Sequence, residues 1–491
     1  MEMQKHSLGL CHGNFMNFSF LIVSLIFIFL SSSLLLTNDV FFCSSTLSTD
    51  PHTVPDAEIN HKSVEQNPSI PQPRTRRFDT QLKHVVFGIA ASSSLWPQRK
   101  HYIKQWWRPR VARAVVWLDK PVRTSRNERL PPIRISRDTS RLHYSNPSGE
   151  RSALRLSRIV AETVKLKWRD VRWFVMGDDD TIFILENLVN VLAKYDHTQF
   201  YYIGSSSESH VRNIRFSYQM AYGGGGFAIS YPLAVELEKM QDRCLQRYSA
   251  LYGSDDRVQA CLAEIGVPLT REPGFHQYDV YGNLLGLLAA HPVTPLISLH
   301  HLDYVEPIFP GMSRFQAIQR LFQSVTVDAS SVLQQSICYD KERHWTISIS
   351  WGYVVQIIRG MISPRELEMP SRTFLNWYKK ADYKSYAFNT RPVAKHPCQT
   401  PFIFYLRTAR YDKSKKRTVS VYLRQRVRHP ACAWKMNSPL SIDTIVVFKK
   451  QDPLRWRKSP RRDCCTVLPS KRKTVIYMSV DKCQDDLVLV V

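Results

Sequence analysis

Three consecutive aspartates, Asp178, Asp179 and Asp180, come directly after the apolar run RWFVMG. Three carboxylates at the end of a buried strand repel one another unless a cation or hydrogen-bond donors compensate their charge. Carboxylate oxygens are the hard ligands that Mg²⁺ or Mn²⁺ prefers, and such ions bridge the phosphates of nucleotides. The triplet therefore fits a metal and diphosphate site, and it also fits a solvated acidic loop or a cap for the following helix.

A run of four glycines could serve the same site. Glycine allows the backbone to approach a ligand closely and to adopt positive φ angles. A flexible linker is expected among polar residues, whereas this run lies between Tyr222 and the apolar FAIS. The pattern therefore favours a close-approach turn formed by Gly223, Gly224, Gly225 and Gly226.

An acidic pair and three histidines follow. Asp255 and Asp256 precede a segment of helical apolar period, so they either cap that helix or place one carboxylate at a substrate hydroxyl as a general base. Downstream come His276 in GFHQYD and His300 and His301 in SLHHLD. Each is either a packed side chain or a candidate to complete the metal shell.

The elements that must position these residues alternate in type. From Lys83, short apolar runs alternate with longer helical stretches, which predicts an α/β fold with a mostly parallel sheet covered on both faces. Ligands of such sheets bind at the carboxyl ends of strands, where the aspartate triplet falls. After residue 312 comes a helical stretch, then an aromatic strand-like run and a basic tail with β patterning, which predicts a β-rich accessory domain.

The charge is strongly basic, with 67 Lys and Arg against 42 Asp and Glu. Basic faces attract anions such as phosphorylated cofactors, nucleic acid or acidic polysaccharide, or they only keep the surface solvated. The sequence has no zinc-finger, RRM-like or helix-turn-helix signature, which argues against nucleic acid. The first strand leads into GIAASSSLWPQ instead of a G-x-G-x-x-G, which argues against a nicotinamide cofactor.

The N-terminal region predicts a membrane anchor. Phe18–Leu36 is apolar and uncharged, and its length is close to that of a bilayer span and longer than the apolar part of a signal peptide. Lys5 precedes it, whereas the next 25 residues contain four acids and no Lys or Arg before Lys62, which favours a single-pass type II orientation with the bulk of the chain in the lumen. The polar, proline-containing segment 37–82 is typical of a flexible stem.

The luminal placement bears on the cysteines, because disulfides persist in oxidising compartments. Eight of the ten cysteines lie beyond the predicted anchor and stem, and no pair of C-x-x-C motifs indicates a structural zinc site. Their connectivity cannot be deduced from the spacing. These cysteines are Cys244, Cys261, Cys338, Cys398, Cys432, Cys464, Cys465 and Cys483.

The order of the motifs resembles the fringe-like β-1,3-glycosyltransferases, and most closely their plant branch, long catalogued as a domain of unknown function. The resemblance covers a strand with DDD, then GGGGFAIS, an acidic pair before GVPL, and FH, while the anchor and stem are similar to the type II layout of Golgi enzymes. It implies a GT-A-type nucleotide-sugar-binding domain. The predicted division is a cytosolic tail at 1–17, an anchor at 18–36, a stem at 37–82, the fringe-like domain at 83–312, an extension at 313–379 and a β-rich domain at 380–491.

The resemblance also assigns roles. The aspartate triplet would hold Mn²⁺ or Mg²⁺ and the sugar nucleotide, with Asp178 and Asp179 at the donor. Asp256 would be the base that deprotonates the acceptor hydroxyl, and the four glycines would line the donor or acceptor pocket. Cys244 and Cys261 would form a disulfide, as the corresponding pair does in fringe-like relatives.

The metal histidine departs from the fringe pattern. Fringe proteins read F-H-x-H, whereas this chain has Tyr278 at the second histidine position. Core-1 galactosyltransferases carry a later S-F-H-Y-V-D, which resembles the segment 298–303. We therefore expect Asp178 and Asp180 to bind the metal together with a histidine. His300 is the first candidate for this histidine and His276 is the second.

These features predict a metal-dependent inverting glycosyltransferase of the Golgi membrane. It would move a hexose or N-acetylhexosamine from a UDP-sugar to a hydroxyl of a glycan or glycoprotein, forming a β-1,3 linkage. The alternative is a catalytically weak or inactive carbohydrate- or polyanion-binding membrane protein of the same fold, which the departure at Tyr278 favours.

Overall fold

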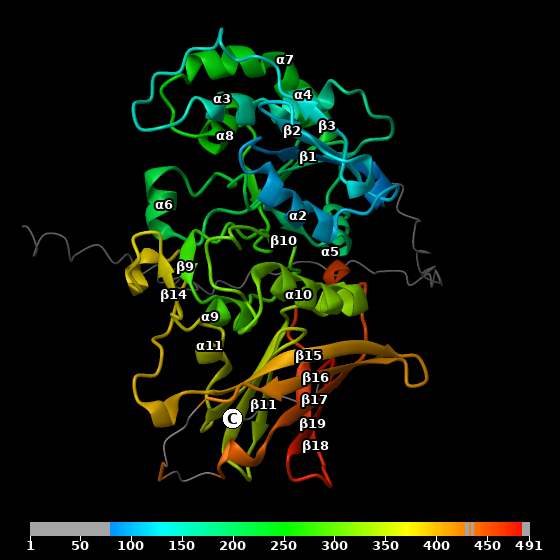
Figure 1. Ribbon diagram of the computed structural model, residues 1–491, viewed down its shortest axis with the longest axis vertical. Helices are drawn as coiled ribbons and strands as arrows, with labels where there is room; N and C mark the ends of the chain where they lie inside the picture. Colours follow the sequence, from blue (N-terminus) through cyan, green and yellow to red (C-terminus); the bar gives the residue numbers. More distant parts are fainter. Residues whose placement is uncertain (1–78, 428–431, 434–436, 484–491) are drawn as a thin grey trace, which may run out of the picture. The chain divides into compact units, whose positions relative to one another are not determined.

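The computed structural model describes residues 79–427, 432–433 and 437–483 (Figure 1). All of them belong to the compact unit Pro73–Val491. The predicted cytosolic tail and anchor and most of the stem lie outside the described residues. In the part that is described, no helix is both long enough and apolar enough to cross a membrane.

A seven-stranded mixed sheet forms the first half of this unit, in the order β3-β2-β1-β4-β7-β6-β8. The pairs β1–β2, β1–β4, β2–β3 and β6–β8 are parallel, whereas β7 runs antiparallel to both β4 and β6. The strands are β1 (Val85–Ala90), β2 (Arg113–Leu118), β3 (Ile133–Ile135), β4 (Trp173–Asp178), β6 (Tyr202–Gly204), β7 (Phe227–Ser230) and β8 (Leu269–Arg271).

Both faces of this sheet are covered, as the apolar strands predict. Side chains alternate along a strand, so Phe87 and Ile89 of β1 enter one hydrophobic cluster while Val86 enters another. Helices α2 and α5 contribute to the first cluster, and α3, α4, α7 and α8 to the second. The helices of this half are α2 (Trp96–Trp106), α3 (Ser152–Ser157), α4 (Ile159–Val164), α5 (Leu185–Leu192), α6 (His210–Arg215), α7 (Tyr231–Arg247), α8 (Ser254–Glu264) and α9 (Leu285–Ala289).

Two short strand pairs bring distant segments to the sheet. β5 (Ile182–Phe183), directly after the aspartate triplet, pairs antiparallel with β10 (Ser298–Leu299). β9 (Val280–Gly282) pairs antiparallel with β14 (Phe374–Asn376). The first pairing carries the SLHHLD segment to the end of β4, and the second connects the first half of the unit to the later part of the chain.

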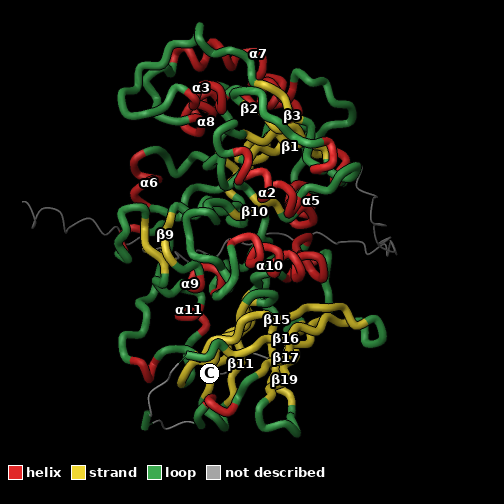
Figure 2. The backbone as a smooth tube through the Cα atoms, in the orientation of Figure 1, coloured by secondary structure: helices red, strands yellow, loops and turns green. Residues whose placement is uncertain are grey.

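An eight-stranded sheet follows, in the order β11-β12-β13-β15-β16-β17-β19-β18 (Figure 2). It is antiparallel except for β17–β19. It takes strands from both the predicted extension and the predicted C-terminal domain, so the predicted boundary at residue 380 falls within its span. The strands are β11 (Gln335–Asp340), β12 (Trp345–Ser350), β13 (Val354–Arg359), β15 (Phe402–Asp412), β16 (Arg417–Arg424), β17 (Thr444–Lys449), β18 (Cys464–Leu468) and β19 (Val475–Asp481).

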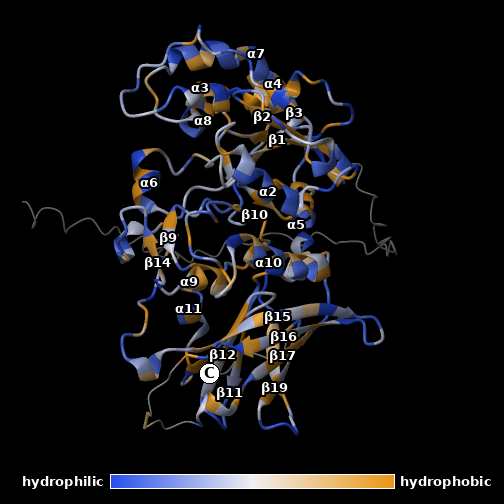
Figure 3. Ribbon diagram, viewed as in Figure 1, coloured by the Kyte–Doolittle hydropathy of each residue, from blue (hydrophilic) through white to orange (hydrophobic). Residues whose placement is uncertain are grey.

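The second sheet is covered on one side by α10 (Arg314–Asp328), whose Arg320 donates to the main-chain carbonyls of β15. β17 and β19 alternate buried and more exposed residues, whereas β12 is buried along its whole length. In Figure 3 the ribbon has the hydrophobic colour along parts of β12 and β15 and the hydrophilic colour at the β15–β16 turn. Shorter helices complete the unit: α11 (Pro364–Leu367), η1 (Leu82–His84), η2 (Arg126–Glu128), η3 (Ala329–Ser331), η4 (Tyr383–Ser385), η5 (Pro397–Gln399), η6 (Pro439–Ser441) and η7 (Arg455–Arg457).

All eight cysteines among the described residues are paired. Cys244–Cys261 joins α7 to α8, and Cys338–Cys465 joins β11 to β18, the two outermost strands of the second sheet, which lie against each other. The sheet therefore curls back on itself. The other two disulfides are Cys398–Cys432 and Cys464–Cys483.

Candidate active site

The aspartate triplet forms a buried turn at the end of β4. The Thr181 N–H donates to the Asp178 carbonyl (3.0 Å), and the Thr181 hydroxyl accepts from the Asp178 N–H (2.8 Å). Asp179 and Asp180 are 2% and 0% exposed, whereas Asp178 lies at the surface of the site. A solvated acidic loop does not have this burial, so the triplet requires compensating positive charge.

His300 supplies a third candidate ligand next to two of these carboxylates. Its Nε2 lies 3.2 Å from Asp180 Oδ1 and 3.8 Å from Asp178 Oδ2, and the candidate ligand atoms of the three residues all lie within 4.8 Å of one another. The Nδ1 of His300 is 3.2 Å from the Gln277 carbonyl, so Nδ1 carries the proton and Nε2 is left to face the carboxylates. Two carboxylates and an imidazole nitrogen are a donor set that fits Mn²⁺ or Mg²⁺.

The ionisation of these groups reflects their crowding. Burial alone would lower the pKa of His300, but Asp180 and Asp178 together raise it to about 9. Burial and the neighbouring Asp180 raise the pKa of Asp179 to about 7. The pKa of Asp180 is lowered, because His300 and Arg99 outweigh the effect of its burial. The cluster thus holds a cationic group when no metal is bound, and a divalent cation would take over that compensation.

The glycine run lies between this cluster and the acidic pair. A Cβ at Gly224 would lie 2.1–2.5 Å from three ring atoms of His300, and a Cβ at Gly223 would lie 2.6 Å from Asp255 Oδ1. The Gly225 N–H donates to Gln277 Oε1 (2.6 Å). The close approach expected of these glycines is therefore an approach to His300 and to the acidic pair.

The two members of the acidic pair have different surroundings. Asp256 accepts the main-chain N–H groups of Tyr252 (3.0 Å), Gly253 (2.9 Å) and Arg257 (2.9 Å) at the start of α8, and its burial raises its pKa. Asp255 faces Gly223 instead. Burial and the nearby Asp178 carboxylate raise the pKa of Asp255 to about 7.

Comparison with known families agrees with this arrangement. A family model described as "Protein of unknown function, DUF604" matches residues 212–465, more than half of the chain. The chain belongs to the DUF604 family. A model described as "Fringe-like" matches residues 80–286. In this DUF604 protein the aspartate triplet therefore lies in the fringe-like match and His300 in the DUF604 match, and the candidate metal cluster needs both.

Curated relatives match the fringe-like part. The β-1,3-N-acetylglucosaminyltransferase lunatic fringe of Homo sapiens is 29% identical over 161 residues, covering 29% of this chain and 42% of the relative, and the Xenopus laevis protein of the same name gives the same figures. The β-1,3-glucosyltransferase of Mus musculus is 31% identical over 138 residues, covering 28% of this chain and 27% of the relative. The DUF604 protein thus spans less than half of the length of these relatives.

His276 of the DUF604 protein lies away from the Asp178–Asp180–His300 cluster. Its Nδ1 is 3.1 Å from Glu208 Oε1, and its Nε2 is 2.9 Å from Nε2 of His291. Both ring nitrogens are therefore occupied by other side chains. Burial lowers the pKa of His276 to about 3.

Sequence reasoning missed two residues that hold the triplet of this DUF604 protein in place. Arg99 of α2 lies 3.2 Å from Asp179 and from Asp180, and 2.8 Å from Asp303. The stretch RKHYIK contains several basic residues, and the sequence does not show which of them reaches the triplet. Only the packing of α2 places Arg99 there. Asp303 ends the SLHHLD motif, so its closeness in sequence to His300 was a signal that could have identified it.

Proposed function

We propose that the chain is a metal-dependent inverting glycosyltransferase that moves a hexose or N-acetylhexosamine from a UDP-sugar to a hydroxyl of a glycan or glycoprotein. The observation that carries the proposal is the buried cluster of Asp178, Asp180 and His300, with a second acidic pair across the glycine turn. The β-1,3-specific names of the relatives support a β-1,3 linkage, and a β product from an α-linked UDP-sugar requires inversion.

Each residue of the cluster has a role in this proposal. Asp178, Asp180 and His300 would hold Mn²⁺ or Mg²⁺, and the bound ion would stabilise the negative charge of a departing diphosphate. Arg99 fixes the carboxylates of Asp179 and Asp180 by ion pairs, so their oxygens stay aimed at the site. The basic surface of the chain would favour the approach of an anionic donor.

Two carboxylates compete for the role of general base. The resemblance to fringe-like enzymes assigns it to Asp256, and this assignment stays a prediction. Asp255 is the competing residue, because a carboxyl with a pKa near 7 is well matched to proton transfer at neutral pH. Asp256 would have to give up at least one of its three main-chain hydrogen bonds to face an acceptor.

The activity can be tested on the purified protein. UDP release is measured with UDP-Gal, UDP-GlcNAc, UDP-GalNAc and UDP-Glc, each with Mn²⁺ and with excess EDTA. We expect release with one donor, lost in EDTA and lowered about 100-fold in Asp180→Asn. Glu342→Gln, an exposed acid in the turn before β12, is the matched control and should behave as the parent.

Two outcomes would count against the enzyme. Metal-dependent UDP binding by calorimetry without turnover on any donor and acceptor would favour the binding-protein alternative. No metal-dependent affinity for UDP would remove the proposed site altogether.

The base is identified by comparing Asp255→Asn with Asp256→Asn under single-turnover conditions. Loss of a general base lowers the rate by about 10²–10⁴-fold. Asparagine also accepts main-chain hydrogen bonds, so Asp256→Asn keeps much of the helix cap, and a melting curve checks this. A large rate loss in Asp255→Asn alone would overturn the assignment to Asp256.

The cellular placement is part of the proposal. A Golgi membrane protein with an anchor at residues 18–36 and a luminal catalytic part would meet UDP-sugars and glycan acceptors in one compartment. Protease protection of the residues after 79 in intact microsomes tests this orientation.

A further inference from the structure

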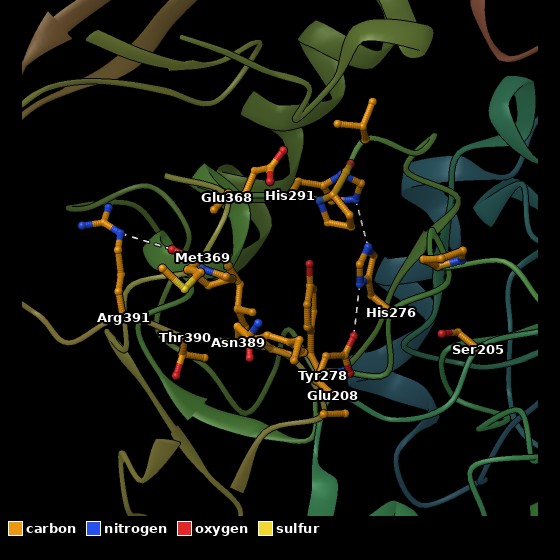
Figure 4. Close-up of a pocket in the computed structure, with 18 of the residues that line it drawn as sticks. Ser205, Glu208, His276, Tyr278, His291, Glu368, Met369, Asn389, Thr390 and Arg391 are labelled. Atoms are coloured by element: carbon orange, nitrogen blue, oxygen red, sulfur yellow. Dashed lines mark hydrogen bonds and ion pairs between the residues drawn. The ribbon is translucent and has the colours of Figure 1, made fainter. Parts of the chain in front are cut away.

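A cavity of about 940 Å³ lies next to the segment that carries His276 and Tyr278 (Figure 4). None of Asp178, Asp180, Asp255 and His300 lines it. Its walls come mainly from Ser205–Glu208 after β6, from the segment before β9, from α9 and the loop after it, and from the region between β13 and β15. It therefore depends on chain that lies beyond the end of the fringe-like match.

One segment separates the cavity from the candidate active site. The side chains of His276 and Tyr278 line the cavity, whereas Gln277 between them turns the other way and accepts the N–H of Gly225. The Gln277 carbonyl contacts His300. The single segment 276–278 thus separates the cavity from the candidate active site.

A hydrogen-bonded chain fixes the inner side of that wall. His291 Nδ1 donates to the Pro292 carbonyl (2.8 Å), so its Nε2 accepts from His276, and the Nδ1 of His276 faces Glu208 at 3.1 Å. The other oxygen of Glu208 accepts the N–H of Tyr278 (2.7 Å). This bond holds Tyr278 at a φ of 51°, a costly conformation for an aromatic residue, with its ring standing between His276 and Met369 (Figure 4).

The rest of the lining combines hydroxyl, amide and apolar side chains. Ser206 is 4% exposed, and its Oγ is buried without a hydrogen-bond partner among the described residues. Asn389 and Thr390 add further polar groups, and Phe275 and Phe388 add apolar ring surface. Polar groups set among aromatic surfaces are what a sugar ring requires, because it presents hydroxyls at its edge and C–H groups on its faces.

The cavity lining carries four arginines, Arg271, Arg365, Arg391 and Arg462, against three acids. Of these acids, Glu208 is engaged by His276 and Tyr278, Glu368 pairs with Arg462, and Glu366 is exposed. Arg271 and Arg365 are exposed and form no ion pair with any described residue. Free arginines at the mouth match carboxylates, which they bind by two parallel hydrogen bonds.

We propose that this cavity binds an oligosaccharide that carries carboxylate groups, that is, a chain containing uronic acid residues. Its volume suits a short run of sugar rings, with hydroxyls at Ser206 and Asn389 and carboxylates at Arg271 and Arg365. Binding here needs neither the metal nor the nucleotide. The proposal therefore stands apart from the transferase activity.

The probe is a hexamer of α-1,4-linked galacturonic acid, titrated by calorimetry into the full-length protein. Its fully methyl-esterified form has the same rings without the charge. We expect the acid to bind and the ester to bind about tenfold more weakly or less. Asn389→Trp, which fills the cavity from an exposed position, should abolish binding of both.

Because the whole chain is basic, variants must separate the cavity from general attraction. Arg271→Gln combined with Arg365→Gln removes two charges at the mouth and should weaken binding about tenfold. Arg410→Gln with Lys413→Gln removes two exposed charges at the distant β15–β16 turn and should leave it unchanged.

The outcomes are exclusive. Equal loss in the two double variants, or equal binding of acid and ester, would overturn the proposal, and so would normal binding by Asn389→Trp. Binding that persists in EDTA and in Asp180→Asn would support the cavity even if no transferase activity were found.

Discussion

The substitution Gly224→Ala tests the geometry of the candidate metal cluster directly. The added Cβ would lie 2.1 Å from Cε1 and 2.5 Å from both nitrogens of His300, whereas ordinary contact begins at 3.4 Å. The backbone of Gly224 is not in the left-handed region, so alanine adds no φ strain. The ring must move by roughly 1 Å to reach ordinary contact, which would disturb its short distances to Asp180 and to the Gln277 carbonyl. A displacement of this size costs about 100-fold in a site that depends on exact positions.

The assay is Mn²⁺ binding to the purified protein, followed by electron paramagnetic resonance of the free ion. Gly266→Ala is the control, because no atom lies within 4 Å of the new Cβ and its φ of +79° makes alanine costly for stability only. We expect Gly224→Ala to lose affinity for Mn²⁺, and Gly266→Ala to lower the melting temperature with normal affinity. Adding His300→Ala to Gly224→Ala should cause little further loss, since both act on one ring. Affinity within threefold of the parent in Gly224→Ala would refute His300 as a ligand in this position.

Three further predictions concern the same region. Because the pKa of His300 is raised to about 9, a proton on this side chain competes with the metal below that pH. The affinity of the parent for Mn²⁺ should therefore rise about tenfold per pH unit between pH 7 and 8.5. The His300→Ala variant should lose this pH dependence. Arg99→Gln leaves buried carboxylates unpaired and should cost about 3–5 kcal/mol of unfolding free energy without metal but clearly less at saturating Mn²⁺; an equal cost in both conditions would contradict the metal assignment. Removing the Cys244–Cys261 disulfide by double serine substitution opens a loop with a sequence separation of 17 and should cost about 3 kcal/mol in denaturant titrations, and a change below 1 kcal/mol would contradict this.

The parts of the site that the sequence could predict are those with local signals. The aspartate triplet follows an apolar run, and this order alone predicts carboxylates at the end of a buried strand. The preference for His300 over His276 came from a motif resemblance. The glycine run predicted a close approach, but the sequence could not say to which residues.

Other parts depend on contacts between distant segments. Arg99 shares a basic helix with Lys100 and Lys104, and only the rotation of α2 on the sheet turns Arg99 toward Asp180 and sends both lysines to Glu128. The partner of His276 is Glu208, 68 residues earlier, with no pattern to link them. The eight-stranded sheet spans the predicted boundary at residue 380, because β13 and β15 pair across a long excursion that the periodicity of neither strand reveals.

The disulfide partners of the two consecutive cysteines in β18 determine the register of this strand. Neighbouring residues on a strand point to opposite faces, and here Cys465 bonds to Cys338 on the far edge strand while Cys464 bonds to Cys483 beyond β19. An exchange of these partners would require β18 to slip by one residue, which would turn every one of its side chains to the other face. The correct disulfide pairing is therefore compatible with only one register of the edge strand β18. A chain in which these cysteines bonded to the wrong partners would keep that strand misaligned during the later steps of folding.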